Sequence, residues 1–459
     1  MKAVKIVLAL LLVAAGCVMF AACKGADNGI AGLVERIGAS GFVKESHLAE
    51  NNRAKILKNI DKHLDELTIE GSDATELFLY RNAHYGVALG AFLAALGAAI
   101  AVCALCAREK VRRAALGLAL VAALFAGLYA LETALGDGSM LITVLKKGVI
   151  YALIAVSMNL LNGFTGLFSL GQAGFMLIGA YTYAIFTIPQ EARAQVYQYF
   201  DGGLVQFTLP VLPAIVLAGV AAVVFAFLIG LPVLRLKGDY LAIATLGFAE
   251  IIRALFQYDK LGPVTNGSNL LRKFPTFDTV LFPFAVVAVC IAIILLLIHS
   301  SYGRAFKAIR DDEVAAEAMG INLFLHKQLS FVISSFFAGV GGALLAMYQT
   351  TVQANAFKSS MTYEILLIVV IGGMGSVTGS VIASFLFIAC SEWLLRFLDV
   401  EQFIGSVQVP LLRSGFRMVV FSIVIMIVVL FFRKGIMGDK ELSLSWLTGG
   451  KKRKEGAVK

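Results

Sequence analysis

The sequence is poor in charged residues. Only 15% of its 459 residues are Asp, Glu, Lys or Arg, whereas soluble globular domains carry about 25%. Hydrophobic residues make up 59% of the chain, and the mean hydropathy is +0.84. So little charge cannot cover a water-exposed surface, so a soluble protein is excluded and an integral membrane protein is predicted.

Motifs for catalysis and metal binding are also lacking. There is no G-x-x-x-x-G-K-[ST] phosphate-binding loop, so the chain does not itself resemble an ATPase. There is no H-E-x-x-H or comparable metal motif, and no nucleophile stands beside a base. Cys103-x-x-Cys106 has no second pair and no nearby histidine, which favours packing over metal or redox chemistry. A membrane-bound enzyme has no support, and no bound metal or cofactor is expected.

The positive charge does not indicate a nucleic-acid partner. The net charge is +9, and its densest cluster is Lys451–Lys454, which follows the last apolar run. Lys and Arg accumulate in short loops on the cytoplasmic side of membrane spans. Loops around Arg108–Arg113, Arg235–Lys237 and Arg304–Lys327 carry the same signal. We expect these loops and the tail to lie inside the cell.

The apolar residues form runs of about 20 residues, which suits membrane-spanning helices rather than barrel strands. The expected fold class is an all-α integral membrane protein, a polytopic helical bundle of about ten to twelve transmembrane helices. The expected spans are 6–22, 86–107, 114–131, 140–160, 170–188, 209–231, 239–257, 279–299, 329–350, 362–375, 377–398 and 416–432. The split inside 362–398 depends on Gly372, Gly373 and Gly375, because glycine permits a tight turn.

These runs divide the chain into parts. Ile56, Ile60 and Leu64 share one face of a helical pattern, so the polar stretch around them is expected to be helical. The parts are an N-terminal membrane span or signal anchor at 1–23, retained rather than cleaved, a small extracytoplasmic helical insert at 24–84, additional spans at 86–135, a main transmembrane domain at 140–432 and a basic cytoplasmic tail at 433–459.

A short charged segment, 300–327, stands between two long apolar runs. Asp311, Asp312 and Glu313 are expected to begin a helix there, because carboxylates oppose the positive end of the helix dipole. Gly320 is expected to end it as a C-cap. Spacing alone allows two interpretations. The helix either enters a groove on a partner protein or lies on the membrane as an amphipathic connector.

A polar, glycine-rich stretch occurs at membrane depth within Asn159–Gln172. Backbone broken by Gly163, Gly166 and Gly171 must be buried in protein or line a wet cavity. Transporters present polar groups to substrates at such breaks. Packing through small residues explains the pattern equally well. The candidates for the translocation pathway here are Asn159, Asn162, Thr165, Ser169 and Gln172.

Other polar residues fall inside predicted spans. Glu250 and Arg253 are three positions apart on one helix face, so they can pair. Charges inside a membrane usually pair or mark a pathway, so this pair either locks helices together or contacts substrate. Thr245 and Tyr181 complete the pathway candidates.

Several long segments resemble the permeases of ABC-type branched-chain amino-acid importers. Glu317-Ala318-Met319-Gly320 matches the acidic-Ala-x-Gly core of the cytoplasmic coupling loop of ABC importer permeases. The other matching segments are Asn159–Gln172, Gly179–Tyr181, Arg235–Arg253, Thr265–Gly267 and Gly372–Ser376. They run in the expected order from about 140 to 375, and the first 135 residues lie outside the resemblance.

The resemblance implies an ABC permease domain at 140–432 with its ATPase-coupling loop at 300–327. The residues implied to contact the ATPase are Arg310, Asp311, Glu313, Ala316, Glu317, Ala318 and Gly320. It implies ATP-binding-cassette ATPase subunits, a homologous second permease subunit and an extracytoplasmic substrate-binding protein as partners in the lipid bilayer. ATP would be used by the ATPase partner, whose motion would switch the permeases between outward and inward access. The implied cargo is leucine, isoleucine and valine, carried across the inner membrane.

Two alternatives remain open. Urea and short amides use closely similar permeases, which changes the cargo but keeps the fold. A secondary transporter would need no ATPase, and an intramembrane acid such as Glu250 would then relay protons.

Overall fold

The computed structural model describes one long, nearly continuous part of the chain and several short ones. The described residues are 30–36, 56, 60, 77, 80, 121–122, 124–129, 131–132, 139–200, 203–236, 238–277, 279–394, 403–404, 407–408, 426, 435–438 and 441. The chain divides into two compact units, residues 1–138 with 443–459, and residues 139–442. The expected spans 6–22, 86–107 and 416–432 fall almost wholly outside the described residues.

In the first unit, the described residues are helical. Helix α2 covers Ile30–Arg36 and buries Leu33 and Val34. Ile56 and Ile60, which the pattern assigns to one apolar face, are helical and fully buried.

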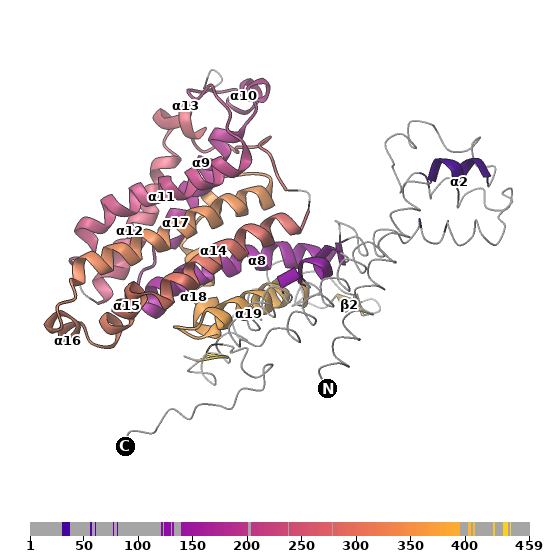
Figure 1. The fold of residues 1–459 in the computed structure, drawn as a ribbon. Coiled ribbons are helices and arrows are strands. Elements are labelled where there is room, and N and C mark those ends of the chain that lie inside the picture. The colour runs from indigo at the N-terminus through magenta and orange to yellow at the C-terminus, as the bar shows by residue number, and fades with distance from the viewer. Residues whose placement is uncertain are drawn as a thin grey trace, which may run out of the picture. The chain divides into compact units, whose positions relative to one another are not determined.

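The second unit is a helical bundle, as predicted (Figure 1). Its long helices are α8 (Met140–Asn159), α9 (Gln172–Thr187), α11 (Val211–Val233), α12 (Asp239–Phe256), α14 (Leu281–His299), α17 (Leu323–Gln349), α18 (Ser359–Gly372) and α19 (Val377–Ile388). The short elements are η3 (Leu160–Phe164), α10 (Gln190–Val196), η4 (Asp259–Leu261), α13 (Gly262–Thr265), α15 (Ser301–Asp311), α16 (Glu313–Ala318), η5 (Ala354–Ala356), η6 (Ala389–Leu394) and the two-residue strands β1 (Phe403–Ile404) and β2 (Val407–Gln408). The predicted all-α class is confirmed.

Membrane-crossing helices are recognisable by length and composition. Among the described residues, four qualify, namely Met140–Phe164, Val211–Val233, Leu281–His299 and Leu323–Gln349. Residues Tyr240–Phe256 and Asp259–Thr265 form a further broken pair, bent by 64°. The predicted span at 329–350 begins earlier than expected, at Leu323, because Asn322 caps the helix there with a bond from Leu325 N of 3.1 Å.

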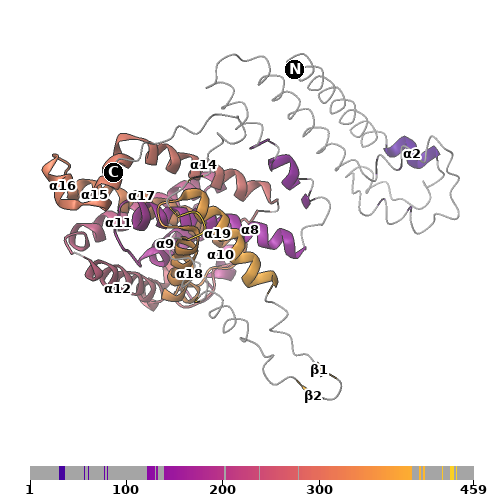
Figure 2. The ribbon, with the colours of Figure 1, turned by 90° about the horizontal axis from the view of Figure 1, so that it is seen from below.

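The core of the bundle lies where α9 crosses α17. In Figure 2, α11 and α12 lie to one side of this pair, and α8 and α19 lie to the other. A Cβ on Gly179 would lie 2.1 Å from the carbonyl oxygen of Gly339, and a Cβ on Gly342 would lie 2.1 Å from that of Met176. The two helices therefore touch backbone to backbone, as glycine permits in membrane bundles.

The helices alternate in direction, which sorts the connections between two ends. The α15–α16 segment lies at one end, here named the basic end, with the breaks after α8 and α18, because Arg310 of α15 bonds Gly163 and Gly163 adjoins Gly375. Arg235 follows α11, whose last turns line a groove with the start of α17 at this end. Helices α10 and α13 lie at the opposite end (Figure 1). The positive-inside rule predicts that the basic end is the cytoplasmic one.

Candidate functional site

The charged segment at the basic end forms two helices rather than the single one expected. Helix α15 is amphipathic and buries Gly303, Phe306 and Ile309. It stops at Asp311, because Asp312 is extended and caps the next helix. The Asp312 carboxylate accepts bonds from Val314 N at 2.9 Å and Ala315 N at 3.1 Å. An N-cap side chain satisfies the free amides of a helix start in this way.

Gly320 ends the second helix, α16, as predicted. Its φ is +86°, in the left-handed region that favours glycine. The amide of Gly320 donates to Glu317 O at 2.9 Å, and the amide of Ile321 donates to Ala316 O at 3.1 Å. This bond pair is a Schellman ending. No heavy atom lies within 4 Å of the position a Cβ would take, so backbone conformation and not crowding requires the glycine.

Helix α16 presents apolar side chains outward. Val314 is 78% exposed and Met319 is 83% exposed, whereas Ala316 is buried against the bundle. An ion pair of 2.7 Å between Glu313 and Lys327 ties α16 to α17. Exposed apolar side chains on a firmly capped helix outside the bundle are typical of a protein-binding surface.

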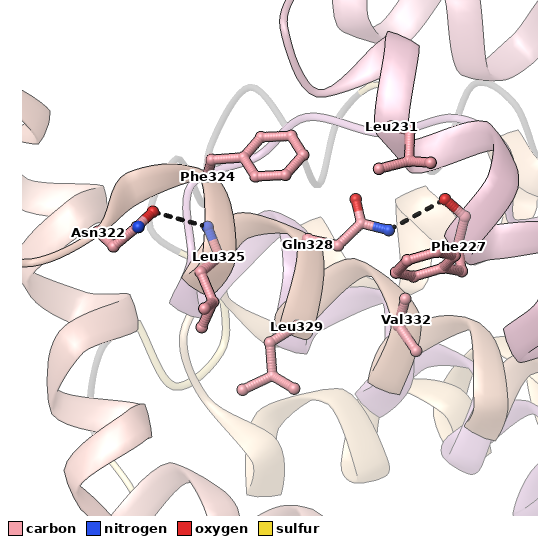
Figure 3. A pocket seen from close by; sticks show the side chains of 8 residues that line it. All are labelled: Phe227, Leu231, Asn322, Phe324, Leu325, Gln328, Leu329 and Val332. Carbon is pink, nitrogen blue, oxygen red and sulfur yellow. Dashed lines mark hydrogen bonds between the residues drawn. The ribbon is translucent and has the colours of Figure 1, made fainter.

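An apolar groove lies beside this segment, between α11 and the first turns of α17 (Figure 3). Its volume is about 420 Å³. Gln328 lines it and donates to Phe227 O at 3.2 Å, while its buried Oε1 has no hydrogen-bond partner among the described residues. The other residues lining the groove are Leu231, Asn322, Phe324, Leu325, Leu329 and Val332. The groove is therefore lined almost entirely by apolar side chains of α11 and α17.

The first helix break, after α8, is held together by a cluster of hydrogen bonds. Helix α8 widens into the π-helix η3, and π-turns are frequent at functional sites. Thr165 donates its hydroxyl to Leu160 O at 3.1 Å. The Asn162 side chain bonds both backbone groups of Ser169, accepting at 3.3 Å and donating at 3.4 Å.

Residues of α8, α9 and α12 complete this cluster of hydrogen bonds. Thr245 of α12 accepts from Leu170 N at 2.9 Å, and Gln172 donates to the Ser157 hydroxyl at 2.7 Å. Gly166 has a φ of +77°, which turns the chain back toward the bundle. A Cβ on Gly171 would lie 3.1 Å from Thr245 O, so this glycine permits close approach of α12.

All the pathway candidates of this region are buried. Asn159, Asn162, Thr165, Ser169, Gln172, Thr245 and Tyr181 are each at most 7% exposed. Tyr181 packs edge-on against Phe256, with ring centroids 4.9 Å apart. The Tyr181 hydroxyl has no hydrogen-bond partner among the described residues, whereas the other side chains are hydrogen-bonded within the bundle. Their contact with substrate stays a prediction.

The second break, after α18, is held from two sides. From α8, Asn159 accepts from Gly375 N at 2.9 Å and donates to Ser376 O at 2.9 Å and to Ser380 Oγ at 2.8 Å. From the C-terminal segment, Glu441 accepts from Val377 N at 2.6 Å and from Thr378 N at 3.1 Å. Glu441 therefore caps α19, a role that no local sequence pattern signals.

The same C-terminal segment packs on the glycines of this break. The amide of Met437 donates to Gly372 O at 3.2 Å. A Cβ on Gly373, whose φ is +109°, would lie 2.7 Å from Gly438 O. These contacts leave no room for a side chain at Gly372 or Gly373.

Glu250 and Arg253 form the expected pair, with Oε2 and Nε 2.7 Å apart. Glu250 does more than pair. Its Oε1 accepts from the backbone amide of Ser359 at 3.3 Å and from the Ser359 hydroxyl. It thereby caps α18 from a different helix, because carboxylates are favourable at helix N-termini.

The opposite end is built around a buried cation. Arg193 is 3% exposed and donates to the carbonyls of Ile185, Ile188 and Phe207, at 3.3, 3.2 and 2.8 Å. Burial lowers its pKa. Nearby, Tyr197 donates to Val264 O at 3.0 Å, and burial raises the pKa of its phenol to about 12.

One ion pair within the bundle was not predicted from the sequence. Lys147 and Glu392 form an ion pair of 2.5 Å between α8 and η6. Both lie in apolar segments, and a charge inside a predicted span is the signal that would have suggested the pairing.

The chain is similar to membrane components of amino-acid transport systems. The family model described as "Branched-chain amino acid transport system / permease component" matches residues 140–431. The high-affinity branched-chain amino acid transport system permease protein LivM of Escherichia coli (strain K12) is 32% identical over 283 residues, which are 54% of this chain and 62% of that protein.

More distant relatives cover more of their own length. The probable branched-chain amino acid transport permease protein LivM of Methanocaldococcus jannaschii is 21% identical over 323 residues, 64% of this chain and 92% of that protein. The high-affinity permease protein LivH of Escherichia coli (strain K12) is 23% identical over 309 residues, 64% of this chain and 93% of that protein. Of the more similar LivM protein of Escherichia coli (strain K12), the chain spans only 62% of the length. No solved structure is significantly similar to the chain.

Proposed function

The chain belongs to the family of permease components of branched-chain amino acid transport systems, and we propose that it is the membrane-spanning subunit of an ATP-driven importer of leucine, isoleucine and valine. It is a multi-pass protein of the inner membrane, of a transport rather than an enzyme family. The observation that carries the proposal is the α15–α16 segment, because it combines a firmly capped helix with outward apolar side chains at the basic end.

The α15–α16 segment would bind the ATPase partner. Asp312 and Gly320 fix the two ends of α16, and the Glu313–Lys327 ion pair fixes its position on α17. Val314 and Met319 project from this fixed helix. A displacement of these side chains by the ATPase would therefore be transmitted through α16 to α17. ATP would be bound and hydrolysed by the partner, and this chain would hold no nucleotide.

A second permease would stand opposite this one. The chain is similar both to proteins named LivM and to a protein named LivH, and both names occur in Escherichia coli (strain K12). Two related permeases in one organism agree with a paired transporter. An extracytoplasmic binding protein would deliver the amino acid at the end that carries α10 and α13, where Arg193 stiffens the loops.

Transport would then follow from alternating access. Closure of the ATPases displaces the coupling segment, and the paired bundles switch between two packed arrangements. The broken helices at Gly163 and Gly375 are the places where the backbone departs from regular α-helix at the basic end, so conformational change is expected there.

The test is uptake in proteoliposomes that contain the full complex. Labelled leucine should accumulate with ATP and binding protein, should persist with an uncoupler, and should be displaced by isoleucine and valine but not by urea. Uptake that collapses with the uncoupler would indicate a secondary transporter, and displacement by urea alone would indicate the amide cargo.

The proposed ATPase-binding surface at Val314 and Met319 is tested by co-purification with the ATPase. Changing both Val314 and Met319 to Asp should release the ATPase, because charges then replace the apolar contact. Leu204→Asp, at the opposite end and 71% exposed, is the matched control and should keep the ATPase bound. Equal retention of the ATPase by both variants would contradict the assignment.

A further inference from the structure

Arg310 is exposed at the surface of α15, yet its guanidinium reaches back to the bundle. Its Nη1 donates to Gly163 O at 3.2 Å, although the two residues are 147 positions apart. We infer that Arg310 is a positioning residue that ties the coupling segment to the helix break at Gly163 and, through Asn159, to the break at Gly375. This inference rests on the proposed function and gives Arg310 a role within the bundle that is separate from binding the ATPase.

The guanidinium is held in place on both sides. Asp311 accepts from Nε at 3.0 Å and from Nη2 at 2.9 Å, which leaves Nη1 for Gly163 O. That carbonyl lies near the end of η3, where helices leave carbonyl groups unbonded. A cation is favourable at the negative end of a helix dipole, so the contact is attractive as well as geometrically suited.

Helix α15 also touches the break through its backbone. A Cβ on Gly166 would lie 3.0 Å from Cγ and 3.2 Å from Cα of Arg310. One turn earlier, Lys307 places its ammonium 5.6 Å from the centre of the Phe164 ring. Phe306 and Ile309 are buried on the inner face of the same helix. A displacement of α15 therefore has to displace the chain at 163–166.

The contact continues from the first break to the second. A Cβ on Gly163 would lie 1.9 Å from Oδ1 of Asn159 and 2.5 Å from the amide nitrogen of Gly375. Asn159 in turn bonds Gly375 N, Ser376 O and Ser380 Oγ. Arg310, Gly163, Asn159 and Gly375 thus form one line of direct contacts across three segments of the chain.

A purely structural role would have a different signature. If Arg310 only satisfied a helix end, its loss would weaken folding, and ATP hydrolysis and uptake would fall together. If it transmits motion, its loss separates them. The complex would then still hydrolyse ATP, while each ATP would move less leucine.

The experiment compares three variants in the reconstituted complex with its ATPase, second permease and binding protein. Arg310→Met keeps the aliphatic stem against Gly166 and removes the guanidinium. Arg310→Lys restores a positive charge with a different shape. Arg235→Met is the matched control, because Arg235 lies at the basic end outside the α15–α16 segment, is exposed, and makes no side-chain hydrogen bond or ion pair within the described residues.

Leucine transported per ATP hydrolysed should fall about tenfold or more in Arg310→Met, in the range of typical coupling energies. ATP hydrolysis itself should stay within about twofold of the wild-type rate. Arg310→Lys should recover part of the loss, and Arg235→Met should match wild type. Wild-type transport per ATP in Arg310→Met would overturn the inference, as would parallel loss of both activities without recovery in Arg310→Lys.

A second readout does not depend on the cargo. Met374, in the second break, is 51% exposed, so Met374→Cys in a cysteine-free background can be labelled by a thiol reagent. The labelling rate should change with ATP in the otherwise wild-type complex, and this change should vanish with Arg310→Met. If leucine is not transported but labelling still follows ATP, the proposed cargo is wrong while loss of the response in Arg310→Met still supports the link. A response that survives Arg310→Met overturns the link whatever the cargo.

Discussion

Replacing Asn159 with Ala should destabilise the bundle. Asn159 is fully buried, and its side-chain amide joins α8 to the turn between α18 and α19. The bond that matters most is the 2.9 Å contact from Gly375 N, because that amide is buried and has no other acceptor among the described residues. Ser376 O keeps a bond from Ser380 Oγ at 3.0 Å, so it loses less.

The size of the effect follows from these bonds. A buried amide left without an acceptor destabilises a fold by about 1–3 kcal/mol. Loss of the bonds to Ser376 and Ser380, with the small cavity left by the side chain, adds about 1 kcal/mol. A total of about 3 kcal/mol corresponds to a melting temperature lower by roughly 5–10 °C for a unit of this size.

The assay is thermal unfolding of the purified chain in detergent, followed by circular dichroism. Asn159→Asp keeps an acceptor for Gly375 and should lose less than Asn159→Ala. Asn355→Ala is the control, since Asn355 is exposed in η5 and makes no hydrogen bond within the described residues. If Asn159→Ala melts within about one degree of wild type while uptake falls, the side chain belongs to the substrate path and the reasoning from its bonds is wrong.

Three further outcomes are expected. Gly320→Ala should loosen the end of α16 by about 1–2 kcal/mol, because alanine is strained at a φ of +86°, and Gly320→Asn should lose less; hydrogen exchange at 313–321 that is equal in all three proteins would contradict this. Glu441→Ala should speed amide exchange at Val377 and Thr378, at a loss of about 0.5–2 kcal/mol typical of a missing cap, and unchanged exchange would show that the cap is dispensable. Burial raises the pKa of Tyr197 from 10.0 to about 12, so the folded state keeps a proton that the unfolded state releases above pH 10. The stability from this group should be full below pH 10 and decline between pH 10 and 12. Tyr197→Phe should flatten this part of the plot of melting temperature against pH, and an unchanged plot would show that Tyr197 is not the cause.

The sequence predicted what depends on short-range pattern. Spans such as 140–160, 170–188 and 239–257 follow from runs of apolar residues, and the structure has α8, α9 and α12 at those places. Gly320 was predictable because a left-handed helix ending favours glycine wherever the helix lies. The break between Asp311 and Glu313 was missed, since the acidic run suits either a continuing first turn or a cap.

Partners distant in sequence were not predictable in the same way. Asn159 and Gly375 are 216 positions apart, and nothing near either residue specifies the other. The sequence shows that polar residues lie at membrane depth, but both a wet pathway and a buried network produce that pattern. The resemblance assigned Arg310 to the ATPase contact, and only the packing of α15 on η3 shows that its side chain donates to Gly163 O.

The backbone contact between α9 and α17 limits how this protein can change shape. A slide of one residue along either helix would drive a Cβ into a carbonyl at Gly179 or Gly342, where the clearance is already that of two main chains. The pair must therefore travel as one rigid body, and hinge motion has to arise in the segments around it. An inhibitor that separates these two helices would have to unfold the bundle. An inhibitor that immobilises the breaks at the basic end would instead stop the transport cycle and leave the fold intact.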